Sequence, residues 1–162
     1  MLIKNTKDLF VKLLSDYRQY EERLTYACKE LREASQDTSA KESLDSLLFL
    51  EDKTLATIDQ CFKLIGEQPV KFNERMYDLF LEDFRKEVNE MQSPVAKLLY
   101  ITAKANHLIH IRLGELGTLV AMSDISGNHG VGLLLESCFA NKIAFIERTR
   151  RKIRKTIEKE II

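Results

Sequence analysis

The sequence predicts an all-α protein: a bundle of four long helices, with a shorter helix crossing over between the second and the third. Apolar residues recur at spacings of three and four over long stretches, as on the buried face of a helix. The chain has only two prolines and six glycines in 162 residues, which leaves few interruptions. Residues 67–92 form a connection too long for a tight turn between helices, which predicts the crossover.

The first two long helices are expected at about Thr6–Ser35 and from Ser39 to about Gly66. Thr6 is a candidate N-cap of the first helix. Ser39 and Glu42 fit a capping box, in which each side chain accepts from the other residue's backbone N–H. Gly66 is a typical C-terminal stop, because glycine adopts the left-handed backbone conformation without strain.

Each of these helices carries one carboxylate in the middle of its apolar stripe. The two stripes read Phe10, Leu13, Tyr17, Glu21, Leu24, Cys28 and Leu31, and then Leu44, Leu48, Glu51, Leu55, Ile58, Phe62 and Ile65. A buried charge without a partner is very costly. We therefore expect Glu21 to have a cationic partner.

The crossover helix is expected at Phe72–Met91 and the central helix of the bundle at Ser93–Gly127. Ser93 is a good N-cap, and Pro94 suits the first helical position because it lacks an N–H group. A hinge spans Ser123–Gly132, and the last helix is expected from Val131 to the end. Its predicted stripe is Leu135, Phe139, Ile143, Ile146, Arg150, Ile153, Ile157 and Ile161.

The composition favours a single cytoplasmic domain over residues 1–162. Lysine plus arginine equals aspartate plus glutamate at 25 each, so no global charge attracts nucleic acid or a membrane. No apolar run approaches the roughly 20 residues of a membrane span. Cys28, Cys61 and Cys138 are far apart and odd in number, which is typical of buried free thiols in a reducing compartment.

Several local matches link the chain to a known family. They are Leu14-Ser15-Asp16 with Glu21 and Leu24, Phe62–Glu67, His110 followed by Gly117–Leu119, and Leu134–Glu136 with Lys142. With these residues the chain resembles the YciE/YciF-like family of bacterial ferritin-like proteins over nearly its whole length. The resemblance implies a ferritin-like four-helix bundle, a homodimer and a loose association with stress responses.

The resemblance fails at the positions where the family would hold metal. Ferritin-like di-iron sites use a glutamate from each of two helices and a Glu-x-x-His pair from each of the others. The family's central Glu-His-x-Glu is Ile109–Arg112 here, and its last-helix glutamate cluster is Phe139–Lys142. The second-helix position falls near Phe49 or Leu50, and the sequence has no Glu-x-x-His or Asp-x-x-His. We expect Ile109, Phe139 and one of these two residues to pack together instead of a di-iron centre.

The leading functional interpretation is therefore a non-catalytic, metal-free bundle with a binding or structural role, without cofactor and with a protein partner of unknown identity. No spacing places a nucleophile beside a base. The alternative is a metal-binding protein, as in a metal-dependent oxidoreductase. Its one transition-metal ion would be held by Glu21, Glu51, His107 and His110.

A second alternative is polyanion binding through the basic end of the last helix. Its cations are Arg148, Arg150, Arg151, Lys152, Arg154, Lys155 and Lys159. Because Glu147, Glu158 and Glu160 dilute this run and no aromatic residue interrupts it, we do not expect nucleic acid as a partner.

The remaining candidate site is a buried polar pair of Glu21 and Arg112. Arg112 shares the apolar stripe of Ile109 in the central helix, where the resemblance implies an acid. A guanidinium there would supply the positive charge that a metal ion once provided, and it can bridge two carboxylates. Lys142 or either of the histidines His107 and His110 are alternative partners for Glu21.

Overall fold

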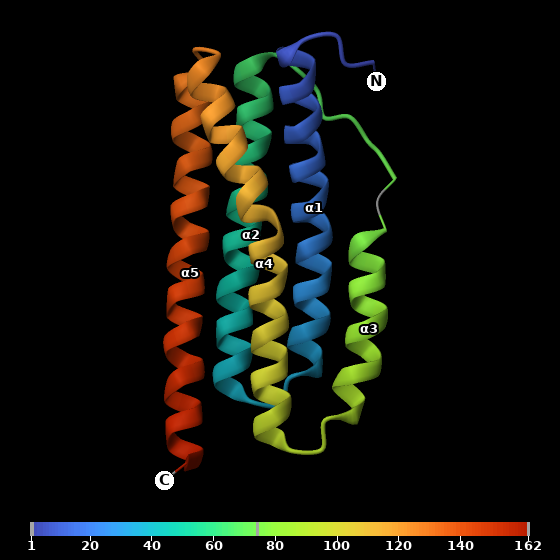
Figure 1. Ribbon diagram of the computed structural model, residues 1–162, viewed down its shortest axis with the longest axis vertical. Coiled ribbons are helices and arrows are strands. Elements are labelled where there is room, and N and C mark those ends of the chain that lie inside the picture. The colour runs from blue at the N-terminus through green and yellow to red at the C-terminus, as the bar shows by residue number, and fades with distance from the viewer. Residues whose placement is uncertain (1, 74, 162) are drawn as a thin grey trace.

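The computed structural model describes residues 2–73 and 75–161, with side chains described as far as residue 159, and contains five α-helices (Figure 1). They are α1 (Thr6–Ala34), α2 (Thr38–Ile65), α3 (Met76–Glu90), α4 (Pro94–Ile125) and α5 (His129–Ile161). No strand occurs within the described ranges. The predicted all-α class is confirmed.

The four long helices form a closed ring around a shared interior. Helix α1 packs on α2 and α4, and α5 packs on the same two helices from the other side. The segment after α2 and then α3 run back along the outside of the bundle, where α3 contacts α1 and α4 (Figure 1). This is the predicted crossover, and the arrangement is consistent with the ferritin-like fold. None of the described helices combines the length and apolar character needed to cross a membrane.

The N-caps of the first two helices lie slightly earlier than predicted. The Asn5 side chain accepts from the backbone N–H of Asp8 at 2.9 Å, and the Asp37 carboxylate accepts from Ala40 N–H at 2.8 Å. Thr6 and Ser39 are therefore inside their helices rather than at the caps. Asparagine and aspartate are at least as good N-caps as threonine or serine, so the nearest strong cap is used in each case.

Other predicted helix ends are confirmed. The Ser93 hydroxyl accepts from Ala96 N–H at 3.3 Å, and Pro94 opens α4. Gly66 ends α2 with φ +70°, the left-handed conformation that favours glycine. The crossover helix is shorter than expected, and α5 begins two residues before Val131.

Helix α5 is rotated relative to the prediction. Its buried residues are Val131, Leu135, Cys138, Lys142, Phe145 and Thr149. Ile143 and Ile157, which were expected in the stripe, are 39% and 40% exposed. The spacing of three and four residues also fits the observed set, which has a lysine in its middle. Ile161 lies outside the residues whose side chains are described.

The interior consists of two apolar clusters, one above the other in the view of Figure 1. The lower core comprises Leu24, Ala27, Cys28, Leu31, Leu44, Leu47, Tyr77, Phe84, Val88, Ile101, Ala105, Leu108, Ile109 and Phe145. The upper core comprises Phe10, Val11, Leu14, Tyr17, Ile58, Cys61, Phe62, Leu116, Leu119, Val131, Leu135 and Cys138. Between them each long helix contributes one buried charged residue: Glu21, Glu51, Arg112 and Lys142. These four residues define the charged layer.

Candidate functional site

The centre of the charged layer is a cluster of three side chains from α1, α2 and α5. Lys142 Nζ donates to both carboxylate oxygens of Glu51 at 2.9 Å. The same nitrogen lies 3.0 Å from Oε1 and 3.1 Å from Oε2 of Glu21. All three side chains are 0% exposed. The ammonium group therefore bridges two carboxylates at mid-bundle, shielded from water.

The helical pattern explains why these residues meet. Glu21 lies between the buried Tyr17 and Leu24, and Glu51 between the buried Leu47 and Thr54, so both face the interior. The predicted stripe members Leu13, Leu48, Leu55 and Ile65 are only half-buried. Lys142 is flanked at helical spacing by Cys138 and Phe145, which are also buried. Its four-carbon stem places a compact charge with three N–H donors between the two acids.

The buried surroundings of this cluster keep a neighbouring thiol and a neighbouring tyrosine hydroxyl protonated. Burial raises the pKa of the Cys28 thiol to about 12, although the positive charge of Lys142 acts in the opposite direction. Burial, followed by the negative charge of Glu21, raises the pKa of the Tyr17 hydroxyl well above its usual range. Because the thiolate is the reactive form of cysteine, Cys28 is a poor nucleophile and a poor metal ligand at neutral pH.

The predicted pair of Glu21 and Arg112 is wrong, because Lys142 takes the place expected for the guanidinium. Arg112 is buried at the right level but turns toward the crossover helix, where its Nη2 donates to Met76 Sδ at 3.6 Å. Its Nη1 donates to Glu115 Oε1 of its own helix at 2.7 Å. Its guanidinium carbon lies 3.0 Å from the ring centre of Tyr20. The ring face and Glu115 together stabilise this cation, so it does not need Glu21.

The alternative metal site is not assembled. His107 and His110 are exposed on α4, whereas Glu21 and Glu51 are buried. The His107 ring lies edge-on to Phe80, with ring centres 5.9 Å apart, and His110 Nδ1 lies 2.8 Å from the backbone oxygen of Asn106. Within the described part of the chain, no group of three or more histidine, cysteine, aspartate or glutamate residues is placed to hold a metal ion.

The expected apolar replacement of the metal ligands is also wrong. Phe49 is 64% exposed on α2, and Leu50 is only half-buried. Ile109 belongs to the lower core and Phe139 packs against the upper core, so the two do not share a cluster. The inward-facing residue of α2 at this level is Glu51.

Lys142, named from the sequence as an alternative partner for Glu21, is the cation that binds it. One signal for it was present: Leu135, Cys138, Lys142, Phe145 and Thr149 keep the spacing of three and four that a buried face requires. A lysine in such a series, with carboxylates in the stripes of two other helices, indicates a buried ion pair.

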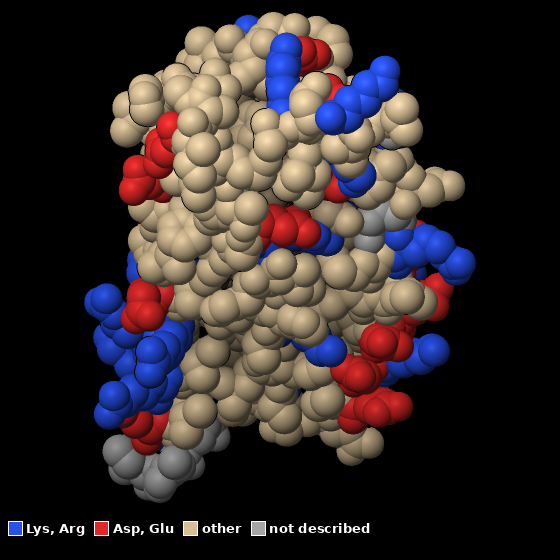
Figure 2. Space-filling view, turned by 45° about the horizontal axis from the view of Figure 1, so that its top comes forward, with Lys and Arg blue, Asp and Glu red and all other residues tan. Residues whose placement is uncertain are grey.

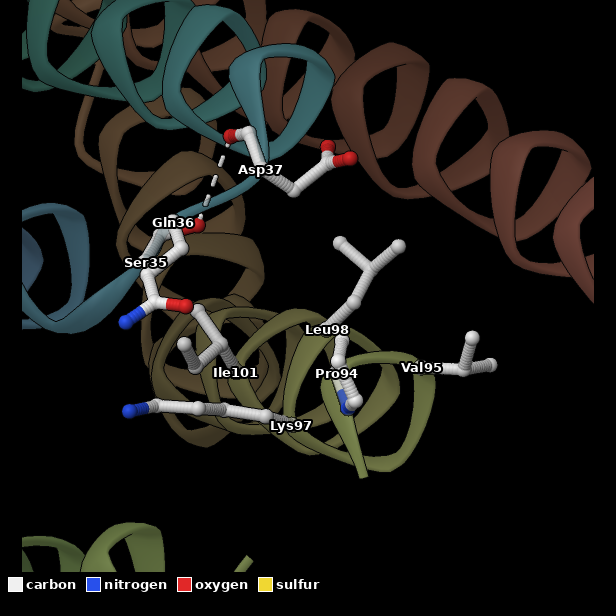
Figure 3. Close-up of a pocket in the computed structure, with 8 residues that line it drawn as sticks. All are labelled: Ser35, Gln36, Asp37, Pro94, Val95, Lys97, Leu98 and Ile101. Atoms are coloured by element: carbon white, nitrogen blue, oxygen red, sulfur yellow. Dashed lines mark hydrogen bonds between the residues drawn. The ribbon is translucent and has the colours of Figure 1, made fainter. Parts of the chain in front are cut away.

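A cleft opens at the lower end of the bundle (Figure 3). It has a volume of about 230 Å³ and lies between the α1–α2 turn and the first turns of α4. Pro94, Leu98 and Ile101 face Ser35 and Asp37 across it. Lys97 is its only cation and Asp37 caps α2, so the cleft offers no convergent set of catalytic groups.

Three solved structures are similar to this chain. YciF, an Escherichia coli stress protein, is 20% identical with a TM-score of 0.87, over 97% of this chain and 99% of that one. YcfI, a putative structural protein from Rhodopseudomonas palustris, is 22% identical with a TM-score of 0.83, over 91% and 94%. A Xanthomonas campestris protein, XCC3681, is 13% identical with a TM-score of 0.71, over 98% and 100%. At these identities the similarity shows the fold alone.

A comparison with curated proteins gives no match. Residues 5–161 match the family described as a domain of unknown function, DUF892. This match covers the helix pairs α1–α2 and α4–α5, the crossover helix and all four residues of the charged layer. The chain therefore belongs to the DUF892 family.

Proposed function

We propose that this chain is a non-catalytic bundle protein that holds its fold without a metal ion and serves a structural or binding role in a stress response. The observation that carries the proposal is the position of Lys142 Nζ, 2.9 to 3.1 Å from carboxylate oxygens of Glu21 and Glu51. Di-iron proteins of similar architecture place metal cations between helices at such a level.

The ammonium group supplies what a metal would otherwise supply to the two acids, namely positive charge and directed contacts. A metal ion entering this position would have to displace a buried ammonium and would find only two carboxylates. Neutral imidazole, which commonly completes such sites, is absent from this cluster because His107 and His110 are exposed. Burial raises the pKa of the Cys28 thiol to about 12, which disfavours the thiolate that would bind a metal.

The wider role rests on weaker support. The descriptions of two similar structures, a stress protein and a putative structural protein, agree with it. The three cysteines are free and buried, as expected in a reducing cytoplasm. Assembly as a homodimer is part of the same proposal and is measurable by light scattering.

Metal content tests the proposal directly. Protein purified from cells grown with added iron and manganese is expected to contain well under one metal ion per chain. Its melting temperature should not change in EDTA, and it should not accelerate the oxidation of ferrous iron. The matched positive control is Lys142→Glu, which places a third carboxylate beside Glu21 and Glu51 and should gain metal-dependent stability. Stoichiometric metal in the wild-type protein, lost in EDTA together with stability, would refute the proposal.

A further inference from the structure

The last turns of α5 separate their charges onto two flanks. One flank carries the cations Arg148, Arg151, Lys152, Lys155 and Lys159, whose spacings of three and four residues align them along the helix. On the other flank Arg154 binds Glu158 at 2.9 Å, and Arg150 lies 3.9 Å from Glu147. Glu158 is therefore held away from the first flank, which we call the basic stripe, whereas Glu147 lies at its edge and lines the same groove as Arg148 and Arg151. Glu160 lies outside the described side chains.

The basic stripe borders a groove between α5 and α2 with a volume of about 920 Å³. Arg148 and Arg151 line it from α5, and Phe49 and Lys53 line it from α2. Figure 2 shows basic side chains gathered toward the C-terminal end of the molecule, beside tan surface. The chain as a whole has no net charge, so this concentration of positive charge is local.

Each of the two acids that line the groove has an arginine beside it from outside the groove. Asp45 accepts from Arg32 Nη2 at 3.1 Å, and Glu147 faces Arg150. By contrast, Lys53, Arg148 and Arg151 form no ion pair with any carboxylate in the described part of the chain. The groove therefore presents three uncompensated cations to solvent.

Phe49 adds an exposed aromatic ring to the positively charged groove. Its side chain is 64% exposed, and among the described residues its ring contacts the ammonium of Lys53, which lies 5.1 Å from the ring centre. An exposed aromatic ring beside a positively charged groove is the combination that binds single-stranded nucleic acid, because each unpaired base offers a face for stacking. In a duplex these faces are already stacked on one another.

We infer that the α2–α5 face binds single-stranded nucleic acid, with phosphates along the basic stripe and a base stacked on Phe49. From Arg148 to Lys159 the stripe extends by about 16 Å along the helix axis, which is long enough to meet several phosphates. This inference is independent of the metal-free centre, since none of its residues belongs to the charged layer.

Fluorescence anisotropy with a labelled oligo-dT of about 20 nucleotides tests the inference. With about four phosphate contacts, the affinity should fall about 50-fold between about 50 and 200 mM salt. Arg151→Gln with Lys155→Gln should weaken binding about tenfold at low salt and flatten this salt dependence. Phe49→Ala should weaken binding by about 5- to 150-fold, the usual effect of losing one stacked base.

The matched control is Arg23→Gln with Arg85→Gln, which removes the same charge from exposed positions on α1 and α3, away from the α2–α5 face. It should leave binding nearly unchanged. Circular dichroism checks that every variant keeps the helical fold, as expected for exposed positions. The inference fails if no binding occurs at micromolar protein, if a duplex of the same length binds as tightly, or if both double variants lose affinity equally. It also fails if Phe49→Ala leaves affinity intact or acts only by dissociating a dimer.

Discussion

Replacing Lys142 by methionine removes the central cation while keeping most of the side-chain length. Glu21 and Glu51 would then share a dry site as like charges, each 0% exposed and no more than about 6 Å apart. Removing one partner of a buried ion pair typically costs about 3–5 kcal/mol. The variant can instead protonate its acids, and protonating a glutamate of ordinary pKa at pH 7 costs about 3.7 kcal/mol in water. Both routes give a loss of about 3–5 kcal/mol.

Urea unfolding followed by circular dichroism measures this loss as a shift in midpoint at constant slope. The pH dependence identifies its cause. In folded Lys142→Met, the two buried glutamates bind protons, whereas glutamates of the unfolded chain have lost theirs above about pH 4.3. The stability of the variant should therefore increase as the pH is lowered from 7 toward 5. The increase should be about 1.4 kcal/mol per pH unit for each proton taken up.

Two comparison variants complete the test. Lys142→Met combined with Glu21→Leu and Glu51→Leu leaves no buried charge in the cluster and should recover most of the lost stability. Arg32→Met, which breaks the exposed Arg32–Asp45 pair, should barely move the midpoint. A small loss for Lys142→Met, or a triple variant as unstable as the single one, would contradict the buried-pair reasoning.

Three further predictions concern the cores, the crossover helix and the thiols. Ile109→Ala, which truncates a side chain with 0% exposure, should cost about 2–5 kcal/mol, whereas Phe49→Ala should leave the urea midpoint almost unchanged. Arg112→Lys should speed hydrogen exchange in α3, because it loses the flat stack on Tyr20 and the approach to Tyr77, whose ring centre is 5.9 Å away. The Cys28 pKa of about 12, raised by burial from 9.0, means that the unfolded chain releases its thiol proton first as the pH rises. The Cys28 contribution to stability should therefore be complete below about pH 9 and fall by about 1.4 kcal/mol per pH unit above it, in addition to that of Cys61, whose pKa is also about 12. Cys28→Ala should reduce the total slope by about 1.4 kcal/mol per pH unit.

The order and type of the helices could be predicted from the sequence because the signals are local and strong. Ser93 with Pro94 at the start of α4 and Gly66 after α2 act through their own backbone chemistry, which does not depend on distant residues. The starts of α1 and α2 were displaced because Asn5 and Thr6, or Asp37 and Ser39, offer competing caps within one turn. Only the folded backbone shows which side chain reaches a free N–H group.

The partners within the charged layer could not be predicted in the same way. Glu21 and Glu51 were placed correctly in buried stripes, since their neighbours along each helix are apolar. The choice between Arg112 and Lys142 depends on the rotation of α4 and α5 about their own axes. A rotation of one residue, about 100°, decides whether a side chain faces the interior or a neighbouring helix. In α5 the buried face includes the charged Lys142, so a search for uniformly apolar positions does not identify the rotation of this helix.

A charged layer between two apolar cores has a consequence for the register of the bundle. Above and below it, one aliphatic side chain can replace another with little penalty, and sliding a helix by one turn would still bury apolar surface. At the layer such a slide would leave Glu21, Glu51 or Lys142 unpaired in a dry interior, which costs several kcal/mol. The triple variant without these charges should therefore be stable yet less uniquely packed, with weaker near-ultraviolet dichroism from its tyrosines. If it keeps the full wild-type signal, the two cores alone specify the register and the layer has no such role.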